Sequence, residues 1–514
     1  MPIVQQGQIN PIGSNVPNWW VQIMQPSAAP IVGAQSNVSA LVGTASWGPV
    51  NQIAYGGGIA DYKAQFGPIM PRKYDMGAHV AIQGMQGASM FMFVRVTDGT
   101  DTAATGTITA ASAADATAIA LAINSGQSSI RGASALINAS ATNAVVTLSS
   151  KYTGSYGNNT AISVATGTRL NTTKVTVSMP GRNVETFDNL GAASATVNNV
   201  TLAGGTDGYT GVTSTSLVGV DGTNRTGMYA LRKSGAAVVS LCDADDSTQW
   251  ASQAAFGLGE NCYVIGTGPA GDTIANAVST KNTAGIDNWC FRLQFGDWTY
   301  FNDTDNGLIR LVSPQAAIAG LRAAYAPHLS LLNRPMQGIV GTQRNGLPGT
   351  SVTRPYSDAD LLQLANAGID VISNPSVGGN FFSSRIGHNT SSNPLTRGDN
   401  YTSLTNFIAK SIGDWSGQWV GKLQTIDQRR QAKAGLDGFF ASLQNQGMIG
   451  AVNGRPAFWT KLDAGNNPLS QVSLGIEQAD VKVQYWSVIE TFLVNVEGSQ
   501  ATVIPSGAPV PVAQ

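Results

Sequence analysis

The part of this sequence that comes nearest to a site for chemistry is a glycine-rich loop that begins at Gly266 and ends at Gly271. A strand-like run leads into it and a helix-like run follows, which is the order found in dinucleotide-binding turns. However, Pro269 lacks the backbone N–H that such a turn offers to a pyrophosphate, and the only acidic residue near the distance expected for a ribose contact is Asp287. We therefore interpret the loop as an ordinary strand-to-helix turn. A nucleotide-dependent α/β enzyme that uses this loop is the alternative.

The residue types give no support for nucleophilic catalysis. The sequence contains no G-x-S-x-G motif, and with only His79, His328 and His388 available, no Asp-His-Ser set with recognisable motifs can be assembled. We expect no catalytic residue, no cofactor and no metal ion. The cysteines, which we interpret as reduced packing residues because no C-x-x-C spacing joins them, are Cys242, Cys262 and Cys290.

Two short polar motifs have simple interpretations. Asp243, Asp245 and Asp246 follow a predicted strand, where carboxylates could bind a metal ion or cap the next helix. Capping is the commoner arrangement, and we favour it. The tripeptide Arg-Gly-Asp at residues 397–399 spells an adhesion motif, but it precedes a predicted helix in a chain without a secretion signal, so we interpret it as a chance match.

The composition favours association with proteins rather than with charged polymers. Hydrophobic residues make up 42% of the 514 residues and charged residues only 11%, against roughly 25% in an average soluble domain. The 29 basic and 30 acidic residues leave a formal net charge of -1, which indicates no electrostatic capture of nucleic acid or of an anionic membrane. The N-terminal stretch MPIVQQGQIN has neither the basic segment nor the apolar core of a signal peptide, so we expect folding in a cytoplasm.

Residues 1–30 are predicted to form an extended arm. Prolines recur along this segment and exclude a regular helix. The stretch NWWVQIM within it carries apolar side chains that a free tail would expose to water, so we expect it to dock elsewhere, as a short strand without a partner in its own chain. The residues of this predicted arm strand are Trp19, Trp20, Val21, Ile23 and Met24.

An α/β pattern begins at residue 31 and is interrupted at residue 97. Up to residue 96 we predict strands at 39–42 and in MFMFVRV, and helices near 59–66 and 78–86. From 97 to 205 the composition shifts to Ala, Thr, Ser, Asn and Gly, with alternating runs such as AVVTLSS and KVTVSM. This change predicts a β-rich insertion, which we expect to face outward because it has few large apolar side chains.

Strand and helix patterns alternate again from residue 206 to 395, which indicates a mostly parallel sheet with helices on its faces. A further domain is predicted at 396–500, followed by a Pro-rich tail at 501–514. Its closing strands are predicted in ADVKVQY and VIETFLVNV. The apolar face of its clearest helix consists of Leu436, Phe439, Phe440 and Leu443. The predicted fold class is therefore α/β, a mixed multidomain α+β chain with a β-rich insertion.

Several of these stretches, in this order, resemble segments of contractile tail sheath proteins of bacteriophages and related injection machines. SNVSALVGTASWGPVNQIAYGGGIADYKAQFG resembles their amino-terminal segment, in which an apolar strand meets a Gly-Thr-Ala-x-x-Gly-Pro turn. MFMFVRV, GSYGNN and LAGGTDG resemble the next strand, a turn of an inserted domain and the junction that closes it. SPQAAIAGLRAAYAP, NNPLSQVSLG and VIETF, with Glu490, resemble later segments, so the resemblance touches nearly the whole chain.

The resemblance implies a structural subunit and not an enzyme. It implies stacked rings of six subunits, wound helically around a tail tube, that shorten to drive the tube through a host envelope for genome delivery. The implied partners are further copies of the chain, the tube protein, and baseplate and tail terminator proteins, with no nucleic acid and no direct membrane contact. The implied location is the virion tail, after assembly in a bacterial cytoplasm. Residues 206–395 would have a subtilisin-like layout without protease activity.

The resemblance also implies that neighbouring subunits exchange strands, and that the C-terminal domain lies innermost against the tube. The arm strand would be one donor. The closing residues expected to take part in strand exchange are Val481, Val483, Tyr485, Phe492, Val494 and Val496. The candidate tube contacts are Lys422, Arg429, Arg430 and Lys433.

Overall fold

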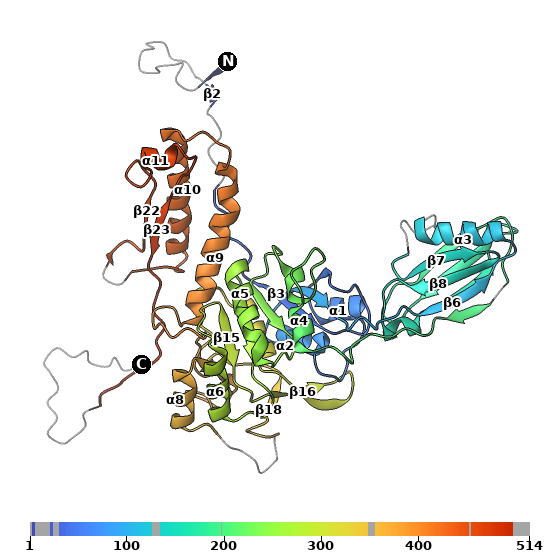
Figure 1. Cartoon of the computed structure of the whole chain (residues 1–514), viewed down its shortest axis with the longest axis horizontal. Coiled ribbons are helices and arrows are strands. Elements are labelled where there is room, and N and C mark those ends of the chain that lie inside the picture. The colour runs from blue at the N-terminus through green and yellow to red at the C-terminus, as the bar shows by residue number, and fades with distance from the viewer. Residues whose placement is uncertain are drawn as a thin grey trace, which may run out of the picture.

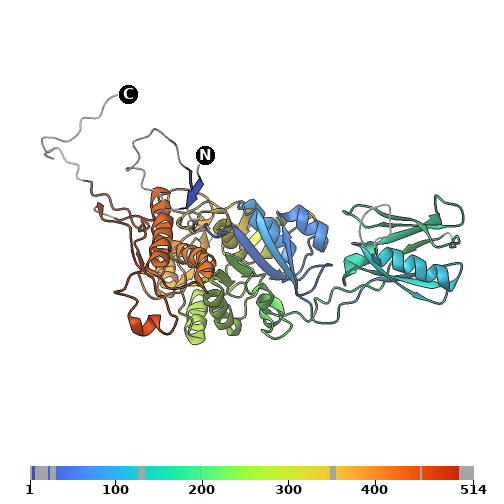
Figure 2. The ribbon, with the colours of Figure 1, turned by 90° about the horizontal axis from the view of Figure 1, so that it is seen from above.

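The protein has an α/β multidomain architecture, as the sequence predicts, with its parts arranged along one long axis (Figures 1 and 2). Among the helices of the described residues, none combines the length and the hydropathy that a membrane span requires. The computed structural model describes residues 3–5, 21–23, 30–125, 134–196, 198–347, 355–451 and 454–496.

A seven-stranded sheet lies at the centre of the described residues. Its neighbouring strands are parallel, except that β4 runs antiparallel to β5. All residues of β5 except the first are buried, because helices cover both faces of the sheet, and this explains the nearly continuous apolar run MFMFVRV. The strand order is β19 (Ile369–Asp370), β15 (Phe291–Gln294), β14 (Tyr263–Thr267), β13 (Val238–Leu241), β3 (Val38–Gly43), β5 (Met90–Arg95) and β4 (Ile53–Gly56).

Two layers of helices cover the sheet. Successive side chains of β3 point to opposite faces of the sheet and so distinguish the two layers. Val42 lies in one hydrophobic cluster with Trp250, and Leu41 lies in another with Phe66. One layer holds α4 (Ser214–Val218), α5 (Trp250–Glu260), α6 (Ile274–Ala284) and α8 (Asp358–Asn366). The other holds α1 (Ile59–Phe66), α2 (Met76–Met85) and α7 (Gln315–Ala324), with the antiparallel sheet β17 (Leu308–Val312), β16 (Thr299–Asp303) and β18 (Ile339–Thr342) beside it.

The insertion, residues 97–205, contains two small sheets at one end of the long axis (Figure 2). One has the order β6 (Thr105–Thr109), β8 (Val145–Ser150), β7 (Ile137–Thr142). The other has the order β11 (Glu185–Leu190), β10 (Thr173–Ser178), β9 (Ala161–Thr166), β12 (Asn199–Thr201). The sequence analysis missed helix α3 (Ala113–Ser125), although Ala116, Ile119, Ala120 and Ile123 have helical spacing and are buried.

The C-terminal lobe, which we define as residues 399–483, lies at the other end of the axis (Figure 2). Its elements are α9 (Asp399–Ser416), α10 (Ile426–Asn445), β22 (Phe458–Lys461), α11 (Leu469–Val472) and β23 (Asp480–Val483). The apolar face predicted for α10 is confirmed, since all four of its residues are buried. The strand predicted in VIETFLVNV is wrong for this single chain, because residues 484–496 form no strand. A strand needs a hydrogen-bonding partner, and the described residues supply none there.

The sharp turn GTASWGP, which follows β3, packs against the insertion. Trp47 is buried among side chains of the insertion, with its ring edge-on to Tyr152 at 5.1 Å between centroids. The guanidinium of Arg182 lies over the Trp47 ring at 4.9 Å. The turn therefore places one large aromatic side chain of the core segment inside the hydrophobic cluster of the insertion.

Arg95, the last residue of β5, fixes the same junction from the sheet side. Its fully buried guanidinium donates to the carbonyl oxygens of Gly48 at 2.8 Å, Thr153 at 2.7 Å and Asp207 at 3.1 Å. Burial lowers the pKa of Arg95 to about 10, so the side chain remains charged at neutral pH. One cation thus holds the turn, the insertion and the returning chain together.

We predict that Gly154→Ala disrupts this junction. Gly154 has a φ of +139°, and a Cβ atom there would lie 2.2 Å from the carbonyl oxygen of Ser46. Backbone strain and this clash together are expected to cost about 2–4 kcal/mol, seen as a lower thermal unfolding midpoint and faster proteolytic release of the insertion. Gly204→Ala is the matched control, because its φ is also positive, at +80°, but its Cβ would meet nothing within 4 Å. Equal effects of the two substitutions would contradict the clash.

A second prediction concerns the pH dependence of stability at Asp75. This buried carboxylate accepts from the amide of Ala78 at the start of α2, and Arg310 Nη2 lies 3.2 Å from its Oδ2. Burial raises the pKa of Asp75 to about 6, against the opposing charge of Arg310. The folded protein therefore holds this proton more tightly than the unfolded chain. The associated stabilisation is complete below about pH 4 and is lost as the pH rises through 6.

Asp75→Asn should remove this contribution while it keeps an oxygen for the helix cap. Relative to the wild type, the variant should gain about 2–3 kcal/mol between pH 4 and pH 7.5. The measurement is the difference between the thermal midpoints of the two proteins across that range. A difference that does not change with pH would contradict the prediction.

Candidate functional site

The glycine-rich loop of the alternative enzyme hypothesis is occupied by contacts within the fold. Gly266 lies in β14, where a Cβ atom would come 2.4 Å from the ring of Phe291. The amides of Gly268 and Gly271 already donate to carbonyl oxygens of the adjacent segment at 2.9 Å, and Trp298 Nε1 donates to the Gly268 carbonyl at 3.0 Å. These amides are therefore not free to hold a phosphate, and the glycines serve close packing, as the sequence interpretation expects.

The structure also brings together a histidine, an aspartate and a serine that the sequence analysis did not associate. His79 Nε2 lies 2.9 Å from Asp243 Oδ1, which also accepts from the backbone amide of Ser313 at 3.0 Å. Although burial opposes ionisation, His79 and Ser313 lower the pKa of Asp243. The three residues are at most 2% exposed, and the aspartate lies between the other two in these contacts. A triad needs its histidine in that central place and needs access for a substrate, so this cluster is a buried link between α2, β13 and α7.

The acidic residues that follow β13 contact three different partners. Asp243 faces the buried cluster, whereas Asp245 pairs with Lys73 at 2.9 Å on the surface. Asp246 accepts from the amide of Thr248 at 2.9 Å and so caps the following turn. Capping, the interpretation favoured from sequence, is confirmed for Asp246. Because the three carboxylates point to different partners, they do not form a common coordination site.

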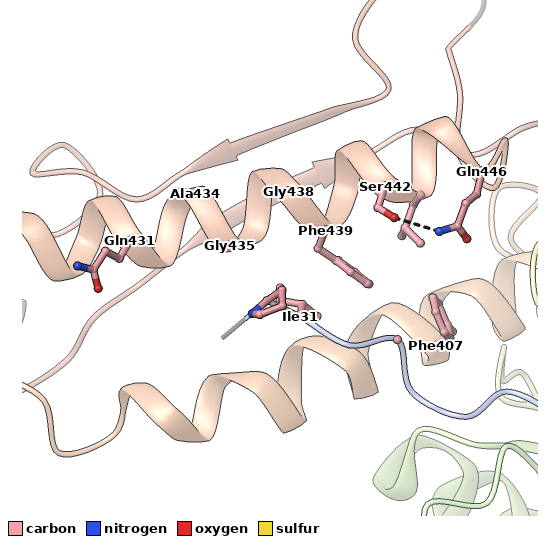
Figure 3. A pocket seen from close by; sticks show the side chains of 12 residues that line it. Ile31, Phe407, Gln431, Ala434, Gly435, Gly438, Phe439, Ser442 and Gln446 are labelled. Atoms are coloured by element: carbon pink, nitrogen blue, oxygen red, sulfur yellow. Dashed lines mark hydrogen bonds between the residues drawn. The ribbon is translucent and has the colours of Figure 1, made fainter. Parts of the chain in front are cut away.

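The N-terminal arm leaves the body through a groove between α9 and α10 (Figure 3). Ile31 is 9% exposed and lies in this groove between Phe407 of α9 and Phe439 of α10. The wall formed by α10 carries small residues, among them Gly435 and Gly438. The helices therefore leave a cavity of about 550 Å³ around residues 30–33, which we call the arm root. The amide of Ala34 then donates to Ser411 Oγ at 2.9 Å, which fixes the chain as it runs toward β3.

The arm contains a strand at the predicted place, β2 (Val21–Ile23), whose role between subunits remains a prediction. We expected this strand to have no partner in its own chain, and that expectation is wrong. β1 (Ile3–Gln5) pairs with it in parallel, with Ile3 opposite Val21 and Gln5 opposite Ile23. No strand among the described residues pairs with the other edge of β2. The remaining arm residues predicted from sequence, Trp19, Trp20 and Met24, lie outside the described residues.

The C-terminal end of the chain also offers strand edges. β22 and β23 form a two-stranded antiparallel ribbon, so each strand has one outer edge without a partner among the described residues. Three of the predicted exchange residues, Val481, Val483 and Tyr485, pack against the cluster of α9 and α10. The other three are exposed in the extended segment that follows, namely Phe492 (82%), Val494 (61%) and Val496 (86%).

The four predicted tube contacts differ in their availability. Arg430 is exposed, with 78% of its side chain accessible and a 3.7 Å ion pair to Asp427. Lys422 lies 4.5 Å above the ring of Trp419, and Lys433 pairs with Asp437 at 2.6 Å. Arg429 is only 13% exposed and faces Gln424 and Glu477, so its geometry suits packing within the lobe.

Comparisons with known proteins identify solved structures that share this fold. No family model matches the sequence, and no curated protein matches it. Among solved structures, the fold is similar to the sheath tail protein of Desulfitobacterium hafniense, with a TM-score of 0.54 and 14% identity over 86% of this chain and 93% of that one. It is similar to the sheath tail protein Lin1278 of Listeria innocua, with a TM-score of 0.55 and 13% identity over 85% and 90%. The helical sheath of the anti-feeding prophage in its contracted state gives a TM-score of 0.54 and 10% identity over 95% and 99%.

We predict that Ile31→Asp releases the arm root. A carboxylate in this apolar groove would lose the burial of the isoleucine and would itself need water, so the arm root should leave the groove. Cleavage by a protease between residues 30 and 37 should become faster, and the lobe should lose about 2–4 kcal/mol of stability. The neighbouring Val32→Asp is the control, because Val32 is 77% exposed and its replacement should change neither readout. Similar effects of both would show that the groove does not hold the arm.

Proposed function

We propose that this chain, which has the fold of contractile tail sheath proteins, is itself a tail sheath subunit. The observation that carries the proposal is the extent of the similarity, which covers 95% of this chain and 99% of the sheath chain of the anti-feeding prophage. Neither a glycine-rich phosphate loop with free amides nor an accessible catalytic set competes with it among the described residues. The protein then acts by assembling, and its functional site is the set of surfaces that join one copy to the next.

The subunits are proposed to form rings of six that stack helically around a tail tube. Strand exchange would join them. The outer edge of β2, the outer edges of the β22–β23 ribbon and the extended segment 484–496 all carry backbone groups that a neighbour could pair. Each hydrogen bond formed in this way contributes about 0.5–1.5 kcal/mol, and the same set recurs at every subunit of the lattice. The local β1–β2 pairing leaves one edge of the arm strand for this purpose.

Contraction is proposed to be a change between two packings of nearly rigid bodies, with the longer form trapped kinetically. The extended chain ends would keep neighbours connected while the bodies rotate. The shortened sheath would drive the tube through a host envelope for genome delivery. No nucleotide is required at that step.

The arrangement of the chain supports a radial orientation within such a sheath. The insertion and the C-terminal lobe lie at opposite ends of the long axis, so one can face outward while the other faces the tube (Figure 2). We assign the tube-facing side to the lobe, where Arg430 and Lys422 are the exposed members of the four candidate contacts. Residues 206–395 are proposed to follow a subtilisin-like layout without protease activity. The remaining proposed partners are baseplate and tail terminator proteins, and the proposed location is the virion, after assembly in a bacterial cytoplasm.

Ile23→Pro tests the strand-exchange mechanism. Proline removes the backbone donor of the last residue of β2 and leaves the α/β body unchanged. We expect a folded monomer with an unchanged circular dichroism spectrum and no tubes by negative-stain electron microscopy. The wild type should form long striated tubes. Ile23→Val is the control, because it keeps both the backbone donor and the apolar side chain.

Two outcomes would contradict the proposal at different levels. Regular contractile tubes formed by the Ile23→Pro variant would mean that the arm strand does not join the subunits. Discrete small particles of the wild type that bind a nicotinamide cofactor would favour the alternative enzyme and overturn the sheath assignment.

A further inference from the structure

Glu490 is held by two basic side chains at the place where the C-terminal segment leaves the body. Its Oε1 lies 2.9 Å from His388 Nε2, and its Oε2 accepts from Arg397 Nη2, also at 2.9 Å. Partial burial opposes ionisation, but His388 and Arg397 outweigh it and hold the pKa of Glu490 below its usual value. The carboxylate is therefore charged at neutral pH and engaged through both of its oxygen atoms.

Internal hydrogen bonds hold the loop that carries these two side chains. His388 and Gly398 form an antiparallel bridge, which brings the two ends of the loop together. The buried side chain of Asn389 crosses the loop and donates to the carbonyl of Thr396 at 2.7 Å and to Thr402 Oγ1 at 2.9 Å. Because internal hydrogen bonds fix the loop, ordering it costs little when the carboxylate binds.

The Arg-Gly-Asp tripeptide connects this loop to the central sheet. Arg397 points to Glu490, whereas Asp399, two residues later, is fully buried and lies 3.2 Å from Arg292 Nη1 of β15. The same guanidinium pairs with Asp370 of β19, and Asp399 Oδ2 also accepts from the amide of Leu331 at 2.8 Å. The two charged residues of the tripeptide thus face opposite ways, one to the sheet and one to the C-terminal segment.

Among the described residues, the hydrogen bonds of the C-terminal segment end at Glu490. Upstream of it, Tyr485 OH lies 3.1 Å from Thr405 Oγ1, and the ring of Trp486 packs on Gly450 so closely that a Cβ there would come within 1.9 Å of it. None of the backbone hydrogen bonds among the described residues involves residues 485–496. Beyond Glu490, the large apolar residues Phe492 and Leu493 are 82% and 78% exposed.

We propose that Glu490, gripped by His388 and Arg397, is the tether that divides the C-terminal segment into a part bound to its own subunit and a part free to reach a neighbour. Residues up to 490 stay on the body. Residues 491–496 begin the reaching arm, whose starting point is fixed relative to the central sheet through Arg397 and Asp399. Glu490 is a positioning residue in this scheme. The existence of the tether is independent of the proposed function, but its consequence for assembly rests on it.

Chymotrypsin cleavage of the monomeric full-length protein, followed by intact mass, tests the tether. Cleavage after Phe492 should be fast in every variant, because that residue is already exposed. Cleavage after Tyr485, which packs against the cluster of α9 and α10, needs the upstream part to leave the body. It should become about three- to fivefold faster in Glu490→Gln and in Arg397→Gln, the range expected for loss of a partly exposed ion pair. Glu477→Gln is the control, since Glu477 makes a looser 4.0 Å pair with Arg429 elsewhere in the lobe.

The outcomes separate the tether from general loosening and from the sheath assignment. Acceleration in the first two variants alone, with an unchanged thermal midpoint, supports the tether. Cleavage of Glu490→Gln at the wild-type rate would overturn it, and so would equal acceleration in Glu477→Gln. If the wild type forms tubes, the Glu490→Gln variant should form shorter or irregular ones. Failure of the wild type to form tubes would count against the proposed function and leave the proteolysis result standing.

Discussion

The fold depends on a guanidinium that is removed entirely from water. Arg292 lies in the central sheet and is compensated by Asp370 from the neighbouring strand and Asp399 from the first residue of α9. Loss of one partner of such a buried set lowers the free energy of unfolding by about 3–5 kcal/mol, because the remaining charge is buried without a counter-charge or water. The arrangement therefore specifies how α9, and with it the C-terminal lobe, is attached to the sheet.

A second buried guanidinium performs the same task at the other end of the sheet. The terminal nitrogens of Arg95 donate to backbone carbonyl oxygens of the turn, the insertion and the returning chain, whereas those of Arg292 pair mainly with carboxylates. Carbonyl oxygens exist at every residue, so the contacts of Arg95 specify backbone geometry rather than partner identity. The weakly charged surface of the chain thus coexists with a few deeply buried cations at the junctions between its parts.

The sequence predicted elements whose signal is local and missed those that depend on distant residues. α1 and α10 have apolar periods or boundaries that can be read directly, and β3 and β5 have the continuous apolar character of strands covered on both faces. Helix α3 was missed because its many alanines match the small-residue composition of the insertion. The contact between His79 and Asp243 joins residues 164 positions apart, and no spacing rule predicts it.

At the candidate assembly site, too, local patterns could be predicted from the sequence and pairing partners could not. The alternation of apolar residues in VIETFLVNV is a real strand signal, yet strand formation also needs an edge to pair with. The described part of the chain leaves that edge empty, and the resemblance implied that a neighbour fills it. The partner of β2 could not be predicted either, because a three-residue strand such as IVQ carries too little periodicity to identify.

Both chain ends are anchored on one helix, and this has a mechanical consequence. Ile31 packs against the middle of α9 through Phe407, and Tyr485 binds the same helix at Thr405. A pulling force applied between Ile31 and Tyr485 would therefore pass through α9 and its neighbours in the lobe. While His388 and Arg397 hold Glu490, a force on the C-terminal segment would also reach the central sheet through Asp399 and Arg292, and the insertion would lie outside its path.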